Sequence, residues 1–119
     1  MKIYQPKTLA VAAKLLAKSG CTKAGIQIMK RKAIGVAVDI GEFSCSLGNI
    51  LKQEALSCGA DAAIHELSSR CGIPKTKIVL IGNLASLQLL ATKLQKNVAD
   101  LPTIGKKLAA TLSQKFPNN

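Results

Sequence analysis

Apolar residues recur every three or four positions along residues 45–58, which is the pattern of a helix with one buried face. That face carries Leu47, Ile50, Leu51, Ala55 and Cys58. Glu54 falls among them, so its carboxylate needs a partner, a position at the edge of the core, or a retained proton. Gly59 follows where helices often end in a left-handed residue, and Ser44 or Ser46 precedes as a candidate N-cap. We therefore expect this helix to be central to the domain.

Two segments have the patterns of β-strands. Residues 33–40 alternate Ile34, Val36, Val38 and Ile40 with small or polar residues, as a half-buried strand does. Gly41-Glu42 should then begin a turn. Residues 77–81 read K-I-V-L-I, which is apolar on both faces and typical of a central strand covered by helices on each side.

The remaining patterns complete a small fold. We expect an α/β or α+β single domain, since 119 residues suit one domain. The predicted strands are residues 2–5, 33–40, 61–65 and 76–81. The predicted helices are residues 6–19 with Pro6 in the first turn, 45–58, 83–95 capped by Asn83, and 103–116 capped by Thr103. Residues 22–32 fit a helix or a strand, and residues 68–74 read as a loop.

The formal net charge is +11, and no acidic residue precedes Asp39. The candidate basic patch comprises Lys7, Lys14 and Lys18, which line one side of the first helix, and the run Lys30, Arg31 and Lys32, which is expected to face water. Such a field favours nucleic acid, an acidic protein or an anionic small molecule, although a solvated lysine-rich surface also explains it. Only three aromatic residues are present, which weighs against base-stacking platforms.

The four cysteines, Cys21, Cys45, Cys58 and Cys71, are far apart and include no C-x-x-C pair. We predict free buried thiols in a reducing cytoplasm, with no metal site and no cofactor. Cys45 is the best placed as a nucleophile, near the start of the central helix, but no histidine accompanies it in sequence. No signal peptide and no apolar run of membrane-spanning length is visible.

Two segments resemble a known family. Residues 49–65, N-I-L-K-Q-E-A-L-S-C-G-A-D-A-A-I-H, resemble the N-terminal extension of the long, archaeal-type dihydropteroate synthases, which typically reads N-I-L-K-Q-E-M-L-S-x-G-G-D/E-A-A. Residues 76–94 resemble the T-D-V-L-L-M-G-T-L-K-Q-L-x-x-L-A-x-K-L of the same region, and G-I-Q-I-M from Gly25 fits its G-I-x-I-M. The chain departs by having Ala at positions 55 and 60, where the family has Met and Gly, and by being far more basic.

In that family the catalysis belongs to a following (β/α)₈ barrel, which holds the pterin diphosphate and the aminobenzoate. A barrel needs on the order of 200 residues or more, so none fits in this chain. The resemblance therefore implies a stand-alone relative of the accessory domain, and no catalytic residue of the barrel maps onto this sequence.

The polar residues of the family-like segment form the candidate ligand or partner surface: Asn49, Lys52, Gln53, Glu54, Asp61 and His65. An architectural role competes with this, in which Asn49 and Gln53 bind neighbouring loops and Glu54 closes a buried polar contact. His65 and Glu66 form a candidate base and orienting carboxylate, but adjacent residues of a strand point to opposite faces. Gly82-Asn83 fits an anion site or, more simply, a tight turn.

Three functions follow. The first is a non-catalytic accessory or binding domain that holds a protein partner or a small anionic ligand. The second is a nucleic-acid-binding protein that uses the lysine-rich N-terminal third. The third is a small enzyme with a site near Asn49, Lys52, Glu54 and His65. A contiguous lysine face would favour the second function, and a pocket containing Glu54 would favour the third.

Overall fold

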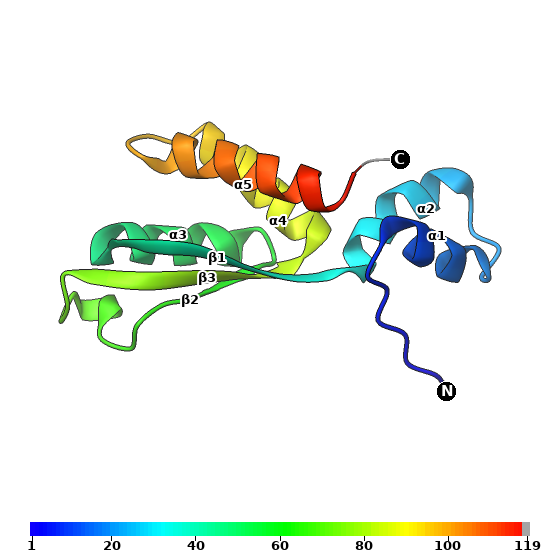
Figure 1. The fold of residues 1–119 in the computed structure, drawn as a ribbon, viewed down its shortest axis with the longest axis horizontal. Helices are drawn as coiled ribbons and strands as arrows, with labels where there is room; N and C mark the ends of the chain where they lie inside the picture. The colour runs from blue at the N-terminus through cyan, green and yellow to red at the C-terminus, as the bar shows by residue number, and fades with distance from the viewer. Residues whose placement is uncertain (118–119) are drawn as a thin grey trace.

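The computed structural model describes residues 1–117, which form helices and three strands (Figure 1). The elements are α1 (Leu9–Ala17), α2 (Lys23–Met29), the 3₁₀ turn η1 (Lys30–Ala33), β1 (Gly35–Ser44), α3 (Cys45–Ser57), β2 (Asp61–Ala63), the 3₁₀ turn η2 (Ser68–Arg70), β3 (Lys75–Asn83), α4 (Leu84–Gln95) and α5 (Leu101–Lys115). The ambiguous residues 22–32 are therefore helical.

The strands form one antiparallel sheet in the order β1-β3-β2, so β3 is the central strand, as its apolar sequence predicts. Because both pairings are antiparallel, and the helices gather beside the sheet, the fold is α+β. The expected strand at residues 2–5 is absent: residues 1–7 have no regular structure, and α1 begins only at Leu9, after the N-cap Thr8.

Only one face of the sheet is covered by helices. On β3 the side chains of Thr76, Ile78 and Leu80 are buried, whereas Lys77 and Ile81 on the opposite face are exposed. The expectation of helices on both sides of this strand is therefore wrong. Ile81 is 44% exposed, so the apolar run K-I-V-L-I does not reflect burial of both faces.

Strand β1 continues through Gly41-Glu42, where a turn was expected. The pairing with β3 shifts register between Asp39 and Gly41, and Gly41 adopts φ of 92°. Its N–H donates to Asp39 Oδ1 at 2.9 Å. Gly41 therefore lies at a β-bulge, which interrupts the pairing without ending the strand. Strand β1 continues to Ser44, which caps α3.

The predicted N-cap is confirmed for α4 and is wrong for α5. Asn83 is the N-cap of α4, as predicted, and its Oδ1 accepts from the Ser86 N–H at 2.8 Å. Helix α5 begins at Leu101 after Asp100, with Pro102 in its first turn, so Thr103 lies inside the helix instead of capping it.

One hydrophobic core joins α1, the sheet, α3, α4 and α5. Its largest fully buried side chains include Leu51, Leu80, Leu87, Leu90 and Leu112. The molecule is elongated, with extents of 51 × 31 × 21 Å and a radius of gyration of 15.9 Å, against about 13.5 Å for a typical domain of this length. Residues 1–33, the N-terminal lobe, form one end (Figure 1). None of the helices within residues 1–117 is long and apolar enough to cross a membrane.

Candidate functional site

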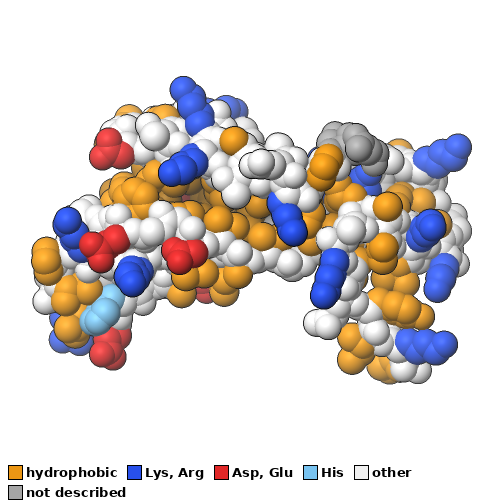
Figure 2. Space-filling model, in the orientation of Figure 1, with side chains coloured by type: hydrophobic (Ala, Val, Ile, Leu, Met, Phe, Trp, Pro, Cys, Tyr) orange, Lys and Arg blue, Asp and Glu red, His pale blue; other side chains and the backbone are white. Residues whose placement is uncertain are grey.

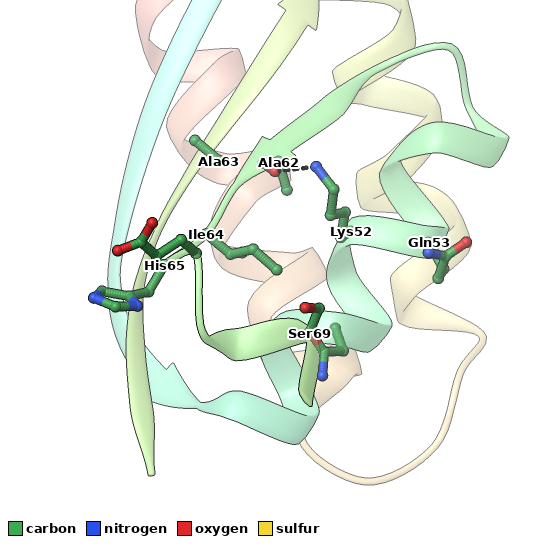
Figure 3. Close-up of a pocket in the computed structure, with 9 residues that line it drawn as sticks. Lys52, Gln53, Ala62, Ala63, Ile64, His65 and Ser69 are labelled. Carbon is green, nitrogen blue, oxygen red and sulfur yellow. Dashed lines mark hydrogen bonds between the residues drawn. The ribbon is translucent and has the colours of Figure 1, made fainter. Parts of the chain in front are cut away.

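An open hollow of about 520 Å³ lies between α3, β2 and the loop that follows β2 (Figure 3). We call it the α3–β2 hollow. It is lined by Asn49, Lys52, Gln53, Ala62, Ala63, Ile64, His65, Glu66 and Ser69. Four of the six predicted surface residues therefore line the same hollow: Asn49, Lys52, Gln53 and His65.

Lys52 reaches from α3 across to β2 (Figure 3). Its Nζ lies 3.0 Å from Asp61 Oδ1 and donates to the Ala62 carbonyl at 2.9 Å. The hydrogen bond from Lys52, with a second from the Ala62 N–H, lowers the pKa of Asp61 below its ordinary value of 3.8. An ammonium group has three N–H donors, so one remains for a ligand in the hollow.

The loop of residues 64–74 forms the wall opposite α3 and is fastened to that helix. A disulfide joins Cys45 to Cys71, with the two Cα atoms 5.6 Å apart. Asn49 Nδ2 donates to the Ser68 carbonyl at 2.9 Å, and the Cys45 N–H donates to the Pro74 carbonyl at 3.0 Å. These bonds place the loop against the N-terminal half of α3.

Free thiols were expected at all four cysteines, and this is wrong for Cys45 and Cys71. Cys21 and Cys58 are free. The pair is 26 residues apart in sequence and meets because the 64–74 loop folds back over the first turn of α3. Cys45 is therefore no longer a candidate nucleophile in this state, since its sulfur is bonded.

His65 is exposed at the rim of the hollow, on the opposite side from Gln53 (Figure 3). Its Nδ1 accepts from the Leu67 N–H at 3.0 Å, so the neutral ring carries its proton on Nε2. Strand β2 ends at Ala63, so His65 and Glu66 belong to the loop and not to the strand assumed above. Both line the hollow.

Asn49 and Glu54 each have a partner within the fold, as the architectural interpretation expects, whereas the side chain of Gln53, which it also named, has none among the described residues. The side-chain amide of Asn49 donates to the Ser68 carbonyl. Glu54 does not line the hollow: its Oε2 lies 3.1 Å from Lys93 Nζ on α4. The four residues proposed for an enzyme site are therefore not assembled, because Glu54 is directed elsewhere.

The hollow has no excess of positive charge. Lys52 and Glu66 carry opposite charges, and Asp61 already pairs with Lys52. The Gln53 side chain makes no hydrogen bond to another described residue, so its amide is available. This set fits a molecule with one anionic group and other hydrogen-bonding groups better than a phosphate, which prefers several cations.

Other candidate sites are simpler. Gly82 and Asn83 are the last two residues of β3 and pair with β1, so the tight turn expected there is absent, and α4 follows directly. The cap bond from the Ser86 N–H to Asn83 uses an N–H group that an anion would need. Within residues 1–117, no three His, Cys, Asp or Glu side chains gather closely enough to hold a metal ion.

Sequence reasoning missed Ile64 and Ser69, which belong to the 64–74 loop. No periodicity marks a loop residue that reaches a helix through a tertiary contact, so no local signal was available. Ala62 and Ala63 lie in the segment singled out above, but their role as lining became clear only from the pairing of β2.

No protein-family model, curated protein or solved structure matches this chain. The likeness to the dihydropteroate synthase extension therefore depends only on the segments quoted above. Those segments, residues 49–65 and 76–94, form most of α3 with β2 and most of β3 with α4.

Proposed function

We propose that this chain is a non-catalytic binding domain that holds a small molecule with one carboxylate in the α3–β2 hollow. The observation that carries the proposal is that Lys52, Gln53 and His65 all line one open hollow. The free N–H of Lys52 and the Nε2–H of His65 are donors suited to a carboxylate. Gln53 and Glu66 offer partners to a second polar group of the ligand.

Binding without turnover is favoured by how the reactive groups are used. His65 Nδ1 accepts from a backbone N–H, which leaves the proton of the neutral ring on Nε2, so neither ring nitrogen is free to act as a general base. The sulfur of Cys45 is in the disulfide, and Lys52 is ion-paired.

We further propose kinship with the dihydropteroate synthase extension. Its support is the quoted residue pattern, which includes Lys52 and Gln53 of the hollow and Asp61 beside it. A barrel protein of that pathway is then the expected partner, and co-purification of this chain with such a barrel tests the kinship.

The ligand proposal is tested by titrating benzoate, and separately the uncharged benzamide, while following backbone amide signals by NMR. Benzoate should shift the signals of the hollow, and benzamide should shift them less. Lys52→Met removes the ammonium group and should weaken benzoate binding about tenfold or more. Asp61→Asn removes the competing carboxylate and should strengthen binding, because it frees Lys52.

The opposite signs separate a ligand contact from general damage to the fold, which would weaken binding in both variants. Lys77→Met is the matched control, because Lys77 is exposed on the open face of the sheet and does not line the hollow. No benzoate-dependent shifts in the hollow, or equal effects of benzoate and benzamide, would contradict the proposal.

A further inference from the structure

The N-terminal lobe is the one end of the molecule without acidic residues. Residues 1–38 contain eight basic residues and neither Asp nor Glu. In Figure 2 the visible Asp and Glu side chains all lie over the opposite half, while Lys and Arg side chains project from the end formed by α1 and α2. The positive field is therefore concentrated at one end of an elongated molecule.

Not every predicted patch residue is on this surface. Lys30 is only 3% exposed, so the expectation that the whole 30–32 run faces water is wrong. Arg31 is half-buried, and Lys32 is exposed. The exposed lysines, which we call the lobe surface, are Lys2, Lys7, Lys14, Lys18, Lys23 and Lys32.

Helix α1 turns its apolar side inward and its basic side outward. Leu9 and Ala12 are buried in the core, while Lys14 and Lys18, one turn apart, are exposed. The Lys18 ammonium lies 5.3 Å from the centre of the Tyr4 ring, which brings the N-terminal segment alongside α1. An interfacial membrane helix presents its apolar side to lipid, but here that side is occupied by the core.

We propose that the lobe surface binds nucleic acid through the phosphate backbone, without sequence preference. Lysine meets phosphates as a mobile point charge, whereas ordered bidentate recognition uses arginine, and the one arginine of the lobe, Arg31, is half-buried. The scarcity of aromatic side chains fits contacts to phosphates and not to bases. This site is separate from the α3–β2 hollow, so either proposal can fail without the other.

The test is fluorescence anisotropy with a labelled 30-base-pair DNA duplex of arbitrary sequence, from 0.05 to 0.2 M NaCl. Three to five lysine–phosphate contacts predict a slope of log K against log salt of about −3 to −5. Replacement of three lobe lysines in Lys7→Gln/Lys14→Gln/Lys18→Gln should weaken binding at least tenfold at 0.1 M salt. The slope should become shallower by about 2 to 3.

The matched control, Lys75→Gln/Lys77→Gln/Lys96→Gln, removes the same charge from exposed lysines outside the lobe. It should stay within about threefold of the unaltered protein. Circular dichroism checks that each variant folds. If the triple variant does not fold, the single variant Lys14→Gln replaces it and should make the slope of log K against log salt shallower by about 1.

Three outcomes would overturn the proposal. The first is no duplex binding at 0.05 M salt. The second is equal weakening in both triple variants, which would show attraction by net charge alone. The third is competition by polyglutamate as strong as competition by unlabelled duplex at equal charge, which would indicate an acidic protein partner.

Discussion

Single side chains explain why the α3–β2 hollow keeps its shape. Lys52 ties α3 to β2 through the Asp61 carboxylate and the Ala62 carbonyl. The same ammonium is the main charged donor for a ligand, so Asp61 both positions Lys52 and competes with the ligand for it. Gly48 has a different role, because its lack of a side chain lets α3 approach β3 closely.

The lowered pKa of Asp61 predicts how stability depends on pH. Its carboxylate is favoured in the folded state, so its contribution is present above the ordinary value of 3.8 and is lost as pH falls through the lower folded pKa. Asp61→Asn should therefore be less stable than the unaltered protein at pH 6, and the difference should shrink below pH 4. Urea unfolding at a series of pH values measures this, and a difference that does not change with pH would contradict it.

Gly48→Ala should destabilise the fold by about 1 to 3 kcal/mol. A Cβ at Gly48 would lie 2.7 Å from Thr76 Cγ2, and Thr76 is buried and held by its hydrogen bond from the His65 N–H. The better helix propensity of alanine offsets only part of this cost.

Gly35→Ala is the control for this prediction, since its Cβ would meet no atom within 4 Å. Chemical denaturation measures both variants. Equal stability of the two would show that α3 can move away from β3 without cost.

At the scale of elements, the fastening of the 64–74 loop to α3 is the decisive feature. This loop supplies His65, Glu66 and Ser69 to the hollow, and the disulfide, the Asn49 bond and the Pro74 bond hold it. Neither β2, with three residues, nor η2 is long enough to order the loop without these contacts.

Reduction of the Cys45–Cys71 bond should lower the free energy of unfolding by about 3 to 4 kcal/mol, because the bond closes a long loop in the unfolded chain. Denaturation with and without a dithiol reductant measures the change. Amide hydrogen exchange should speed up first in the 64–74 loop.

A Cys45→Ser/Cys71→Ser variant should have the same free energy of unfolding as the reduced protein, and the reductant should not change it. Cys58→Ser, at a half-buried free thiol, should keep the response of the unaltered protein. A response that persists without Cys45 and Cys71 would exclude this disulfide as its source.

At the scale of the whole molecule, charge and shape are both uneven. The N-terminal lobe concentrates like charges at one end, while all six acidic residues lie in β1, α3, β2 or the loops near β2 and α5. Like charges repel in the folded lobe, and α2 has no buried residue to compensate for that repulsion.

Raising NaCl from 0.02 to 0.2 M should therefore raise the Tm by a few degrees, because salt screens the repulsion within the lobe. Lys7→Gln/Lys14→Gln/Lys18→Gln should respond less, and Lys75→Gln/Lys77→Gln/Lys96→Gln should respond like the unaltered protein. Thermal melts followed by circular dichroism measure this. Equal salt responses in all three proteins would show that the lobe is not the source.

Local patterns in the sequence determined the main helices around the core and one of their caps. The α3 helix, the Asn83 cap and the central strand β3 depend on residues within a few positions of each other, and Ser44 was one of two candidates for the cap of α3. Periodicity and capping record such short-range physics directly. Lys52 and His65 were placed in one candidate surface for a different reason, because both are polar residues of the segment that resembles the synthase extension.

Only the tertiary structure decided which surfaces are covered and which distant residues meet. The bare face of β3, the bulge that carries β1 past Gly41, the Cys45–Cys71 bond and the burial of Lys30 all depend on segments far apart in sequence. The apolar run of β3 is compatible with a strand covered on one face or on both, because the polarity of a side chain does not reveal which segment packs against it. The hollow exists for the same reason: its two walls come from α3 and a loop that long-range bonds bring together.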